Sequence, residues 1–275
     1  MRNLPLWVVV PCCRPEQLPW IFENFDRQVY QDKRLLIVEN GPAVGACERY
    51  SRKPHYVISS ENHVARARND GIYFVRDHGG GWICMWDDDD WYGPAYLSEV
   101  ELMIRSGVAD VYGKVRNFIG FQEHGLYLFN ERNANGYTNH VHGPTIVFRS
   151  EDARTYPIVS TAEDVLWCLG MADMGARIWA GTINHYMYLR RRPEDHSWKA
   201  SPERMMALSQ FNDYYYWFGE IDTDLVTGKK PWKYFVKDQG NRRFPRPIRT
   251  DEKLYPCKEL PPSGNFADVR IGEVL

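Results

Sequence analysis

Residues 79–97 read GGGWICMWDDDDWYGPAYL, so that a run of bulky apolar residues leads directly into four consecutive aspartates. A short, continuously apolar run is typical of a strand that is buried on both faces of a sheet. In open α/β sheets, ligands collect at the carboxyl ends of the strands, and the aspartates fall at such an end. The stretch therefore predicts a central strand that ends at a charged binding site.

The adjacent carboxylates predict a bound cation. In an extended chain, Asp87 and Asp89 would point the same way and Asp88 the opposite way. Two like charges this close raise each other's pKa unless a positive charge lies between them. Hard divalent cations such as Mg²⁺ or Mn²⁺ prefer carboxylate oxygens as ligands. The alternative is a solvated acidic loop that follows the strand.

The N-terminal part of the chain alternates between apolar and amphipathic segments. Short apolar runs that are typical of buried strands lie at residues 6–10, 35–38, 56–58 and 82–86. Segments that can form helices lie at residues 15–25, 44–52, 64–77, 94–106 and, later, 161–175. Strand and helix in alternation predict an α/β fold, with a Rossmann-like, mostly parallel central sheet flanked by helices.

The composition limits the domain organisation and the setting. A chain of 275 residues can form one large domain with an appendage. We expect a domain over residues 1–200 and, over residues 201–275, an aromatic and basic segment, helical or extended, that packs on it. The net charge of −2 gives no general attraction to nucleic acid or membranes. The apolar runs are too short for a transmembrane segment. Six cysteines without a CxxC pair fit a reducing, cytoplasmic setting.

Five segments carry a pattern in a fixed order: VVVPCCRPEQL (8–18), LLIVENG (35–41), NHVARARNDGI (62–72), ICMWDDDDWYGPAYL (83–97) and TAEDVLW (161–167). Together they resemble a family 2-type glycosyltransferase of the GT-A fold, in which a DxD motif ends a central strand. The resemblance covers about residues 5–200. It implies a hexosyl- or pentosyltransferase with a nucleotide-sugar donor, a UDP-sugar being favoured, and Mn²⁺ or Mg²⁺ as cofactor.

The resemblance also implies a donor site. The aspartates at 87–90 would hold the metal and the diphosphate, with Asp87 and Asp89 as metal ligands. Arg68 would add a positive contact to the phosphates, and Glu39 and Asn40 would meet the base and ribose. Where this chain has Glu39 and Asn40, the family more often has two aspartates followed by Gly-Ser. The full set expected to bind the donor is Pro11, Arg14, Glu39, Asn40, Arg68, Asp87, Asp88 and Gly143.

The acidic pair Glu163–Asp164 is the predicted catalytic site. The resemblance implies that Asp164 is the general base, which takes the proton from the acceptor hydroxyl. Transfer by single displacement would invert the anomeric configuration. The alternative for this pair is a capping box that follows Ser160 and Thr161, in which the helix dipole favours the acidic residues.

Histidines are the other candidate metal ligands. The resemblance places His196 where many GT-A enzymes supply a third metal ligand from a mobile loop, although a histidine in a charged loop is often only solvent-exposed. His140 and His142 are two residues apart and could share a strand face, which makes them a rival ligand pair. His142 is also, with Trp91 and Trp198, an expected acceptor contact.

The acceptor is expected to be a saccharide or glycoconjugate. Aromatic and basic residues interleave between residues 214 and 246, a composition that also suits single-stranded nucleic acid or a flipped base. A hydroxymethylated base in phage-type DNA is therefore an alternative acceptor, and aromatic packing onto the core is the plainer explanation. Two other functions remain open: a nucleotidyltransferase, or a non-catalytic GT-A-like module that binds nucleotide sugars or carbohydrate.

Overall fold

The computed structural model describes residues 5–50, 54–122, 125–129, 135–190, 215–218, 221, 223–229 and 236–237. The chain forms two compact units, of which the first comprises residues 1–115 and 134–182 and the second residues 116–133 and 183–275. The domain boundary expected at residue 200 lies outside the described residues and stays a prediction.

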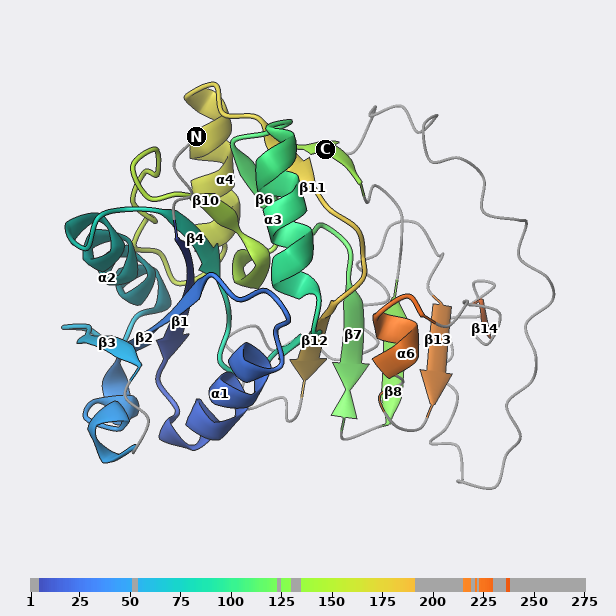
Figure 1. The fold of residues 1–275 in the computed structure, drawn as a ribbon, viewed down its shortest axis with the longest axis horizontal. Helices are drawn as coiled ribbons and strands as arrows, with labels where there is room; N and C mark the ends of the chain where they lie inside the picture. The colour runs from blue at the N-terminus through green and yellow to red at the C-terminus, as the bar shows by residue number, and fades with distance from the viewer. Residues whose placement is uncertain are drawn as a thin grey trace. The chain divides into compact units, whose positions relative to one another are not determined.

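The first unit is built on an eight-stranded sheet with the strand order β3-β2-β1-β4-β10-β6-β11-β9 (Figure 1). The first four strands in the chain are mutually parallel: β1 (Leu6–Cys12), β2 (Lys33–Glu39), β3 (His55–Ile58) and β4 (Trp82–Met85). The others are β6 (Val111–Gly113), β9 (Gly136–Thr138), β10 (Val147–Arg149) and β11 (Ile178–Ala180). Strand β10 runs antiparallel between β4 and β6. The mostly parallel sheet predicted from the apolar runs is therefore confirmed.

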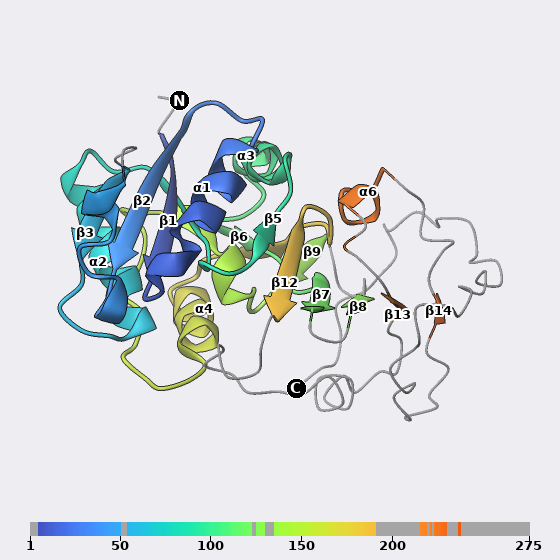
Figure 2. The same ribbon diagram turned by 90° about the horizontal axis from the view of Figure 1, so that it is seen from below.

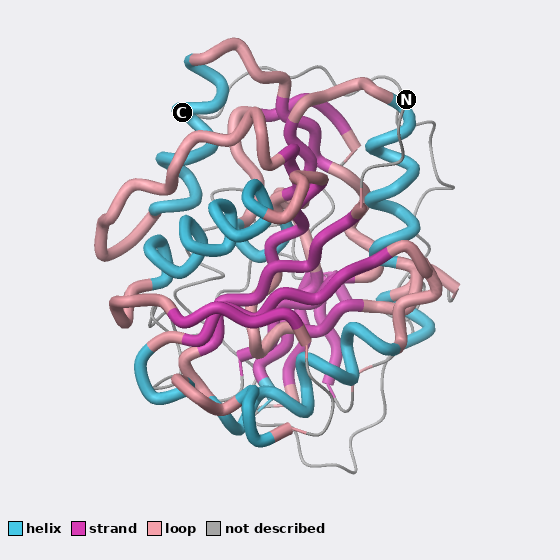
Figure 3. Tube along the Cα trace, turned by 60° about the vertical axis from the view of Figure 1, so that its left-hand side comes forward, coloured by secondary structure: helices cyan, strands magenta, loops and turns pink. Residues whose placement is uncertain are grey.

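Helices cover both faces of this sheet. Helices α1 (Leu18–Asp26) and α3 (Tyr96–Ser106) lie on one face, and α2 (Val64–Asp77) and α4 (Glu163–Asp173) lie on the other (Figures 1 and 2). Figure 3 shows the strands in magenta with helices in cyan on either side. One buried cluster joins alternate residues of the central strands, such as Val9 and Met85, to Ile72 of α2 and Trp167 of α4. This core packs α2 and α4 against the sheet.

The helix expected over residues 44–52 is wrong. The described part of that segment, residues 44–50, instead contains one short 3₁₀ turn, Cys47–Arg49, and a second 3₁₀ turn, Gly41–Ala43, precedes it. The physical reason is the buried carboxylate of Glu39, which accepts the backbone N–H groups of Gly45, at 2.9 Å, and of Cys47. The loop therefore wraps around one carboxylate, and its N–H groups are used there instead of in a continuous helix.

The second unit contains a sheet in which the strands lie in the order β14-β13-β8-β7-β12. They are β7 (Phe118–Phe121), β8 (Leu126–Phe129), β12 (Tyr186–Arg190), β13 (Tyr215–Phe218) and β14 (Val236–Lys237). Helix α6 (Thr223–Val226) is a single turn. Within the described part of residues 201–275, the expected helical or extended segment thus forms two short strands and this turn. Among the helices that the structure describes, none has the length and apolar character needed to cross a bilayer.

Candidate functional site

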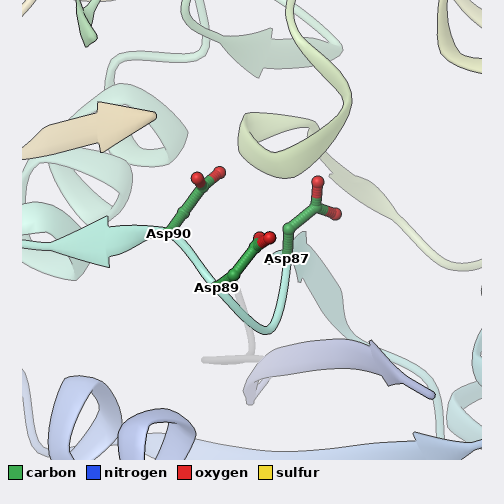
Figure 4. Close-up of side chains that lie close together, drawn as sticks. All are labelled: Asp87, Asp89 and Asp90. Carbon is green, nitrogen blue, oxygen red and sulfur yellow. The ribbon is translucent and has the colours of Figure 1, made fainter. Parts of the chain in front are cut away.

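The four aspartates form a turn between β4 and β5 (Trp91–Tyr92). Figure 4 shows the carboxylates of Asp87, Asp89 and Asp90 directed into the same space. One carboxylate oxygen of each lies within 4.8 Å of those of the other two. The expected extended course is wrong, because the chain bends over residues 88–90. The bend brings Asp90 beside Asp87 and Asp89, which strand alternation did not predict.

Two arginines form ion pairs with aspartates of this turn. Arg14 forms ion pairs with Asp88 and Asp89, its Nη2 lying 2.8 Å from Oδ2 of Asp89. Buried Arg68 reaches from α2, and its Nη2 lies 3.2 Å from Oδ1 of Asp87. Both arginines were predicted to bind the donor. The structure brings them to the acidic turn from positions 74 and 19 residues away in the sequence.

The environment of the turn disfavours charge. Partial burial raises the pKa of Asp87 to about 6, against the opposing effect of Arg68. Burial and the charge of Asp89 raise the pKa of Asp88 to about 7, against the opposing effect of Arg14. Three clustered carboxylates, one of which has a raised pKa, are the donor set and the electrostatic setting that suit a hard divalent cation. The residues present therefore fit the metal that the sequence predicts.

The predicted catalytic pair stands at the start of α4. Oε1 of Glu163 lies 2.7 Å from Nη1 of Arg68, so that one guanidinium bridges Glu163 and Asp87. Asp164 accepts the N–H of Gly143 on Oδ2 at 2.9 Å. A Cβ atom at position 143 would lie 2.9 Å from that same oxygen and 3.0 Å from Nη2 of Arg68, so the close approach needs glycine.

The capping-box explanation for the acidic pair is wrong. The residue before the helix is Ala162, in a left-handed conformation with φ 62°, and its side chain makes no capping hydrogen bond. Neither Ser160 nor Thr161 is in the capping position, and the side chain of Glu163 is bonded to Arg68. Glu163 is therefore bonded to Arg68, while Asp164 accepts the N–H of Gly143 on Oδ2 and that of Val165, in its own helix, on Oδ1 at 2.9 Å.

The residues expected at the base and ribose lie at the end of β2. Glu39 is buried, and its carboxylate is bonded to the following loop. Asn40 donates through Nδ2 to Oδ1 of Asn62 at 3.2 Å, and its own buried Oδ1 has no hydrogen-bond partner among the described residues. Pro11 lies in β1 opposite Val38 of β2. The donor contacts expected of these residues stay predictions.

The strand-face argument for the histidine pair is wrong. His140 and His142 lie in a loop before the 3₁₀ turn Gly143–Thr145, and not in a strand. Trp91 is 5% exposed. The acceptor contacts expected of His142 and Trp91 stay predictions, and His196, Trp198 and most of the aromatic and basic residues between 214 and 246 lie outside the described residues.

Sequence reasoning missed two tyrosines at the site. The ring of Tyr156 lies under Arg68, whose Cζ is 5.4 Å from the ring centroid. The hydroxyl of Tyr92 accepts the N–H of Asp87 at 2.9 Å and donates to the carbonyl of Pro144 at 3.0 Å. The only sequence signal for Tyr92 is its place two residues after the last aspartate, and Tyr156 has none.

Comparisons with known proteins agree with this geometry. The family model described as "Glycosyl transferase family 2" matches residues 7–158, which is more than half of the chain. The match includes β1–β4, Arg68 and the acidic turn, and it ends before the pair at 163–164. No curated protein sequence matches the chain.

Solved structures confirm the fold. S. aureus TarS 1–349 in complex with UDP-GlcNAc has a TM-score of 0.51 and 17% identity, over 70% of this chain and 63% of that one. The mannosyltransferase PcManGT from Pyrobaculum calidifontis, in complex with GDP-Man and Mn²⁺, has a TM-score of 0.52 and 15% identity, over 69% and 57%. This chain thus covers less than two thirds of either protein. The likeness confirms the predicted α/β fold of GT-A type.

Proposed function

Because this chain belongs to glycosyl transferase family 2, we propose that it is a hexosyl- or pentosyltransferase that moves one sugar from a nucleotide-sugar donor to an acceptor hydroxyl. The observation that carries the proposal is the joining of the acidic turn to the acidic pair by one buried arginine. Arg68 bonds both Asp87 and Glu163. This shared contact supports the proposal that the donor-binding and proton-accepting groups belong to one site.

The proposed donor is a UDP-sugar. Structures of the same fold are complexes with UDP-GlcNAc and with GDP-Man. A nucleoside diphosphate carries its charge on the phosphates, and Arg14 and Arg68 both contact the acidic turn. The unpartnered Oδ1 of Asn40 offers an acceptor to the base or ribose.

The proposed cofactor is Mn²⁺ or Mg²⁺, held by Asp87, Asp89 and Asp90. The close approach of their oxygens supports this assignment. The solved structure of PcManGT is also a complex that contains Mn²⁺. When bound, the cation would neutralise the charge that grows on the leaving diphosphate. His196 is proposed as a further ligand from sequence resemblance alone.

The proposed chemistry is a single displacement with inversion at the anomeric carbon. Asp164 takes the proton of the acceptor hydroxyl as the oxygen of that hydroxyl forms a bond to the anomeric carbon. The bond from that carbon to the diphosphate oxygen breaks, and its electrons leave with the nucleoside diphosphate. The Gly143 N–H holds one oxygen of Asp164 in place.

The proposed acceptor is a saccharide or glycoconjugate, with a hydroxymethylated DNA base as the alternative. Each supplies the hydroxyl that the reaction requires. A reducing, cytoplasmic setting is proposed as well, and it is supported by the free thiols of the cysteines at 12, 13, 47, 84 and 168.

The donor proposal is tested by thermal stabilisation. UDP-, GDP- and other nucleotide sugars are screened with Mn²⁺, with Mg²⁺ and with EDTA. A donor at 100 times its Kd adds about 2.7 kcal/mol to the free energy of unfolding, and we expect the Tm to rise only when the metal is present. The Asp89→Asn variant should lose this rise. No rise with any donor and metal would contradict the proposal.

The Asp164→Asn variant separates an enzyme from a binding module. We expect it to keep the donor affinity and to lose turnover by about 10²–10⁴-fold, since it removes the proton acceptor. Asp173→Asn, at the exposed far end of the same helix, is the matched control. Equal turnover in both variants would remove Asp164 as the general base, and donor binding without any turnover in the wild type would favour the non-catalytic module.

A further inference from the structure

The buried hydroxyl of Tyr92 joins two parts of the site, the acidic turn and the turn at residues 143–145. Tyr92 is fully buried, and its ring stacks on Trp86 with the centroids 3.9 Å apart. Its hydroxyl accepts the N–H of Asp87 at 2.9 Å and donates to the carbonyl of Pro144 at 3.0 Å. The first partner belongs to the acidic turn, and the second belongs to the turn whose Gly143 N–H holds Asp164.

The turn at 143–145 is firmly held, so a shift at Pro144 would be passed on to Gly143. The hydroxyl of Thr145 donates to the carbonyl of His142 at 2.8 Å and accepts the N–H of Lys114 at 2.9 Å. The N–H of His142 donates to the carbonyl of Lys114 at 2.8 Å. These bonds tie both ends of the turn to the end of β6.

One backbone hydrogen bond also joins the two halves. The N–H of Met85 donates to the carbonyl of Ile146 at 2.9 Å. Tyr92 acts on the next pair along the two segments, Asp87 and Pro144, which are joined through its hydroxyl and not by a backbone hydrogen bond. The hydroxyl group therefore sets how far the acidic turn lies from the turn at 143–145 beyond the last backbone contact.

We propose that Tyr92 is a positioning residue that fixes the separation between Asp87 and Asp164. The inference rests on the proposed function, in which Asp87 lies at the donor and Asp164 at the acceptor hydroxyl. Removing the hydroxyl leaves a buried N–H and a carbonyl without their partner. The two segments can then shift, and a misplacement of about 1 Å between reacting groups costs about 100-fold in rate.

The test compares Tyr92→Phe with Tyr112→Phe. Tyr112 lies in β6 and is also fully buried. Its hydroxyl also accepts a backbone N–H, that of Ala109, at 3.4 Å. The readouts are the Tm, the Kd of the nucleotide sugar that stabilises the wild type with Mn²⁺, and kcat for hydrolysis of that sugar nucleotide, with water as the acceptor.

We expect Tyr92→Phe to lower kcat by about tenfold or more while the donor Kd changes by less than about threefold. Tyr112→Phe should lower only the Tm. In the Asp164→Asn background, Tyr92→Phe should have little further effect on kcat, since it acts through Asp164. The inference would be overturned if kcat of Tyr92→Phe fell by less than this, or if kcat of Tyr112→Phe fell equally. A loss of donor affinity in Tyr92→Phe as large as its loss of kcat would also overturn it.

Thr145→Val provides a second variant if Tyr92→Phe does not fold. It releases the same turn from its other side, and we expect the same loss of kcat without loss of donor affinity. Unchanged kcat in Thr145→Val would then overturn the inference. A failure of the proposed function is seen in the wild type, which would then neither bind nor hydrolyse any nucleotide sugar, and the inference would fail with it. A failure of the inference alone is seen only in the variants.

Discussion

Nη1 of Arg68 lies 2.7 Å from Oε1 of Glu163, although 95 positions separate the two residues in the sequence. Arg68 lies inside the segment that the family model matches, and Glu163 lies beyond its end at residue 158. The same guanidinium bonds Asp87 on the acidic turn. The buried guanidinium of Arg68 on α2 thus joins the acidic turn to the start of α4.

Loss of the Arg68 charge should destabilise the protein. Arg68→Met leaves Asp87 and Glu163 without their shared counter-charge, and breaking a buried pair costs roughly 3 kcal/mol. Chemical denaturation measures the free energy of unfolding. Arg66→Met is the control, because Arg66 lies on the same helix in an exposed pair with Glu61 and should cost less than about 1 kcal/mol. Equal losses in both variants would show that Arg68 is not a buried counter-ion.

A side chain at position 143 should impair turnover. The Cβ of Gly143→Ala would lie 2.9 Å from Oδ2 of Asp164, so the carboxylate must move. We expect kcat for donor hydrolysis to fall about 100-fold while the protein stays folded. Gly136→Ala is the control, since its Cβ would meet nothing within 4 Å. Unchanged kcat in Gly143→Ala would contradict the placement of Asp164.

Without metal, Asp87 should make the stability depend on pH. Partial burial raises the pKa of Asp87 to about 6 in the folded protein, above the usual value of about 3.9 in an unfolded chain. Between these values the folded state binds more protons, so this group's contribution to stability falls as pH rises. Asp87→Asn should therefore gain stability relative to the wild type when the pH is raised from about 5 to about 8 in EDTA. Denaturation at both pH values measures it, and a constant difference would refute it.

The side chain of Asp90 should contribute to metal binding, although it stands outside the DxD pair. Its backbone carbonyl accepts hydrogen bonds from Trp20 and Asn24, each at 2.8 Å, so the turn should keep its course in Asp90→Asn. Loss of one of three carboxylate ligands should weaken Mn²⁺ binding by about tenfold or more. Titration of free Mn²⁺ by electron paramagnetic resonance measures it. Asp77→Asn, at an exposed acidic residue of α2, is the control; equal affinities in both variants would remove Asp90 from the site.

The sequence by itself determined the parallel strands β1–β4 and the position of the aspartates at the end of β4. Both follow from local patterns, because a continuous apolar run must be buried and a charged run cannot continue it. The order of the five segments also predicted the family, which the family model confirms. The prediction of a helix over residues 44–52 was wrong, since the carboxylate of Glu39 accepts backbone N–H groups of that loop.

Only the tertiary structure decided which groups meet in the site. It brought Asp90 into the acidic cluster, paired Arg68 with Glu163, and placed the Gly143 N–H against Asp164. It also placed the hydroxyl of Tyr92 between Asp87 and Pro144. Periodicity describes the side-chain direction within one regular element. These contacts depend on a bend and on backbone positions set by the packing of α2 and α4 on the sheet, and no local pattern encodes that packing.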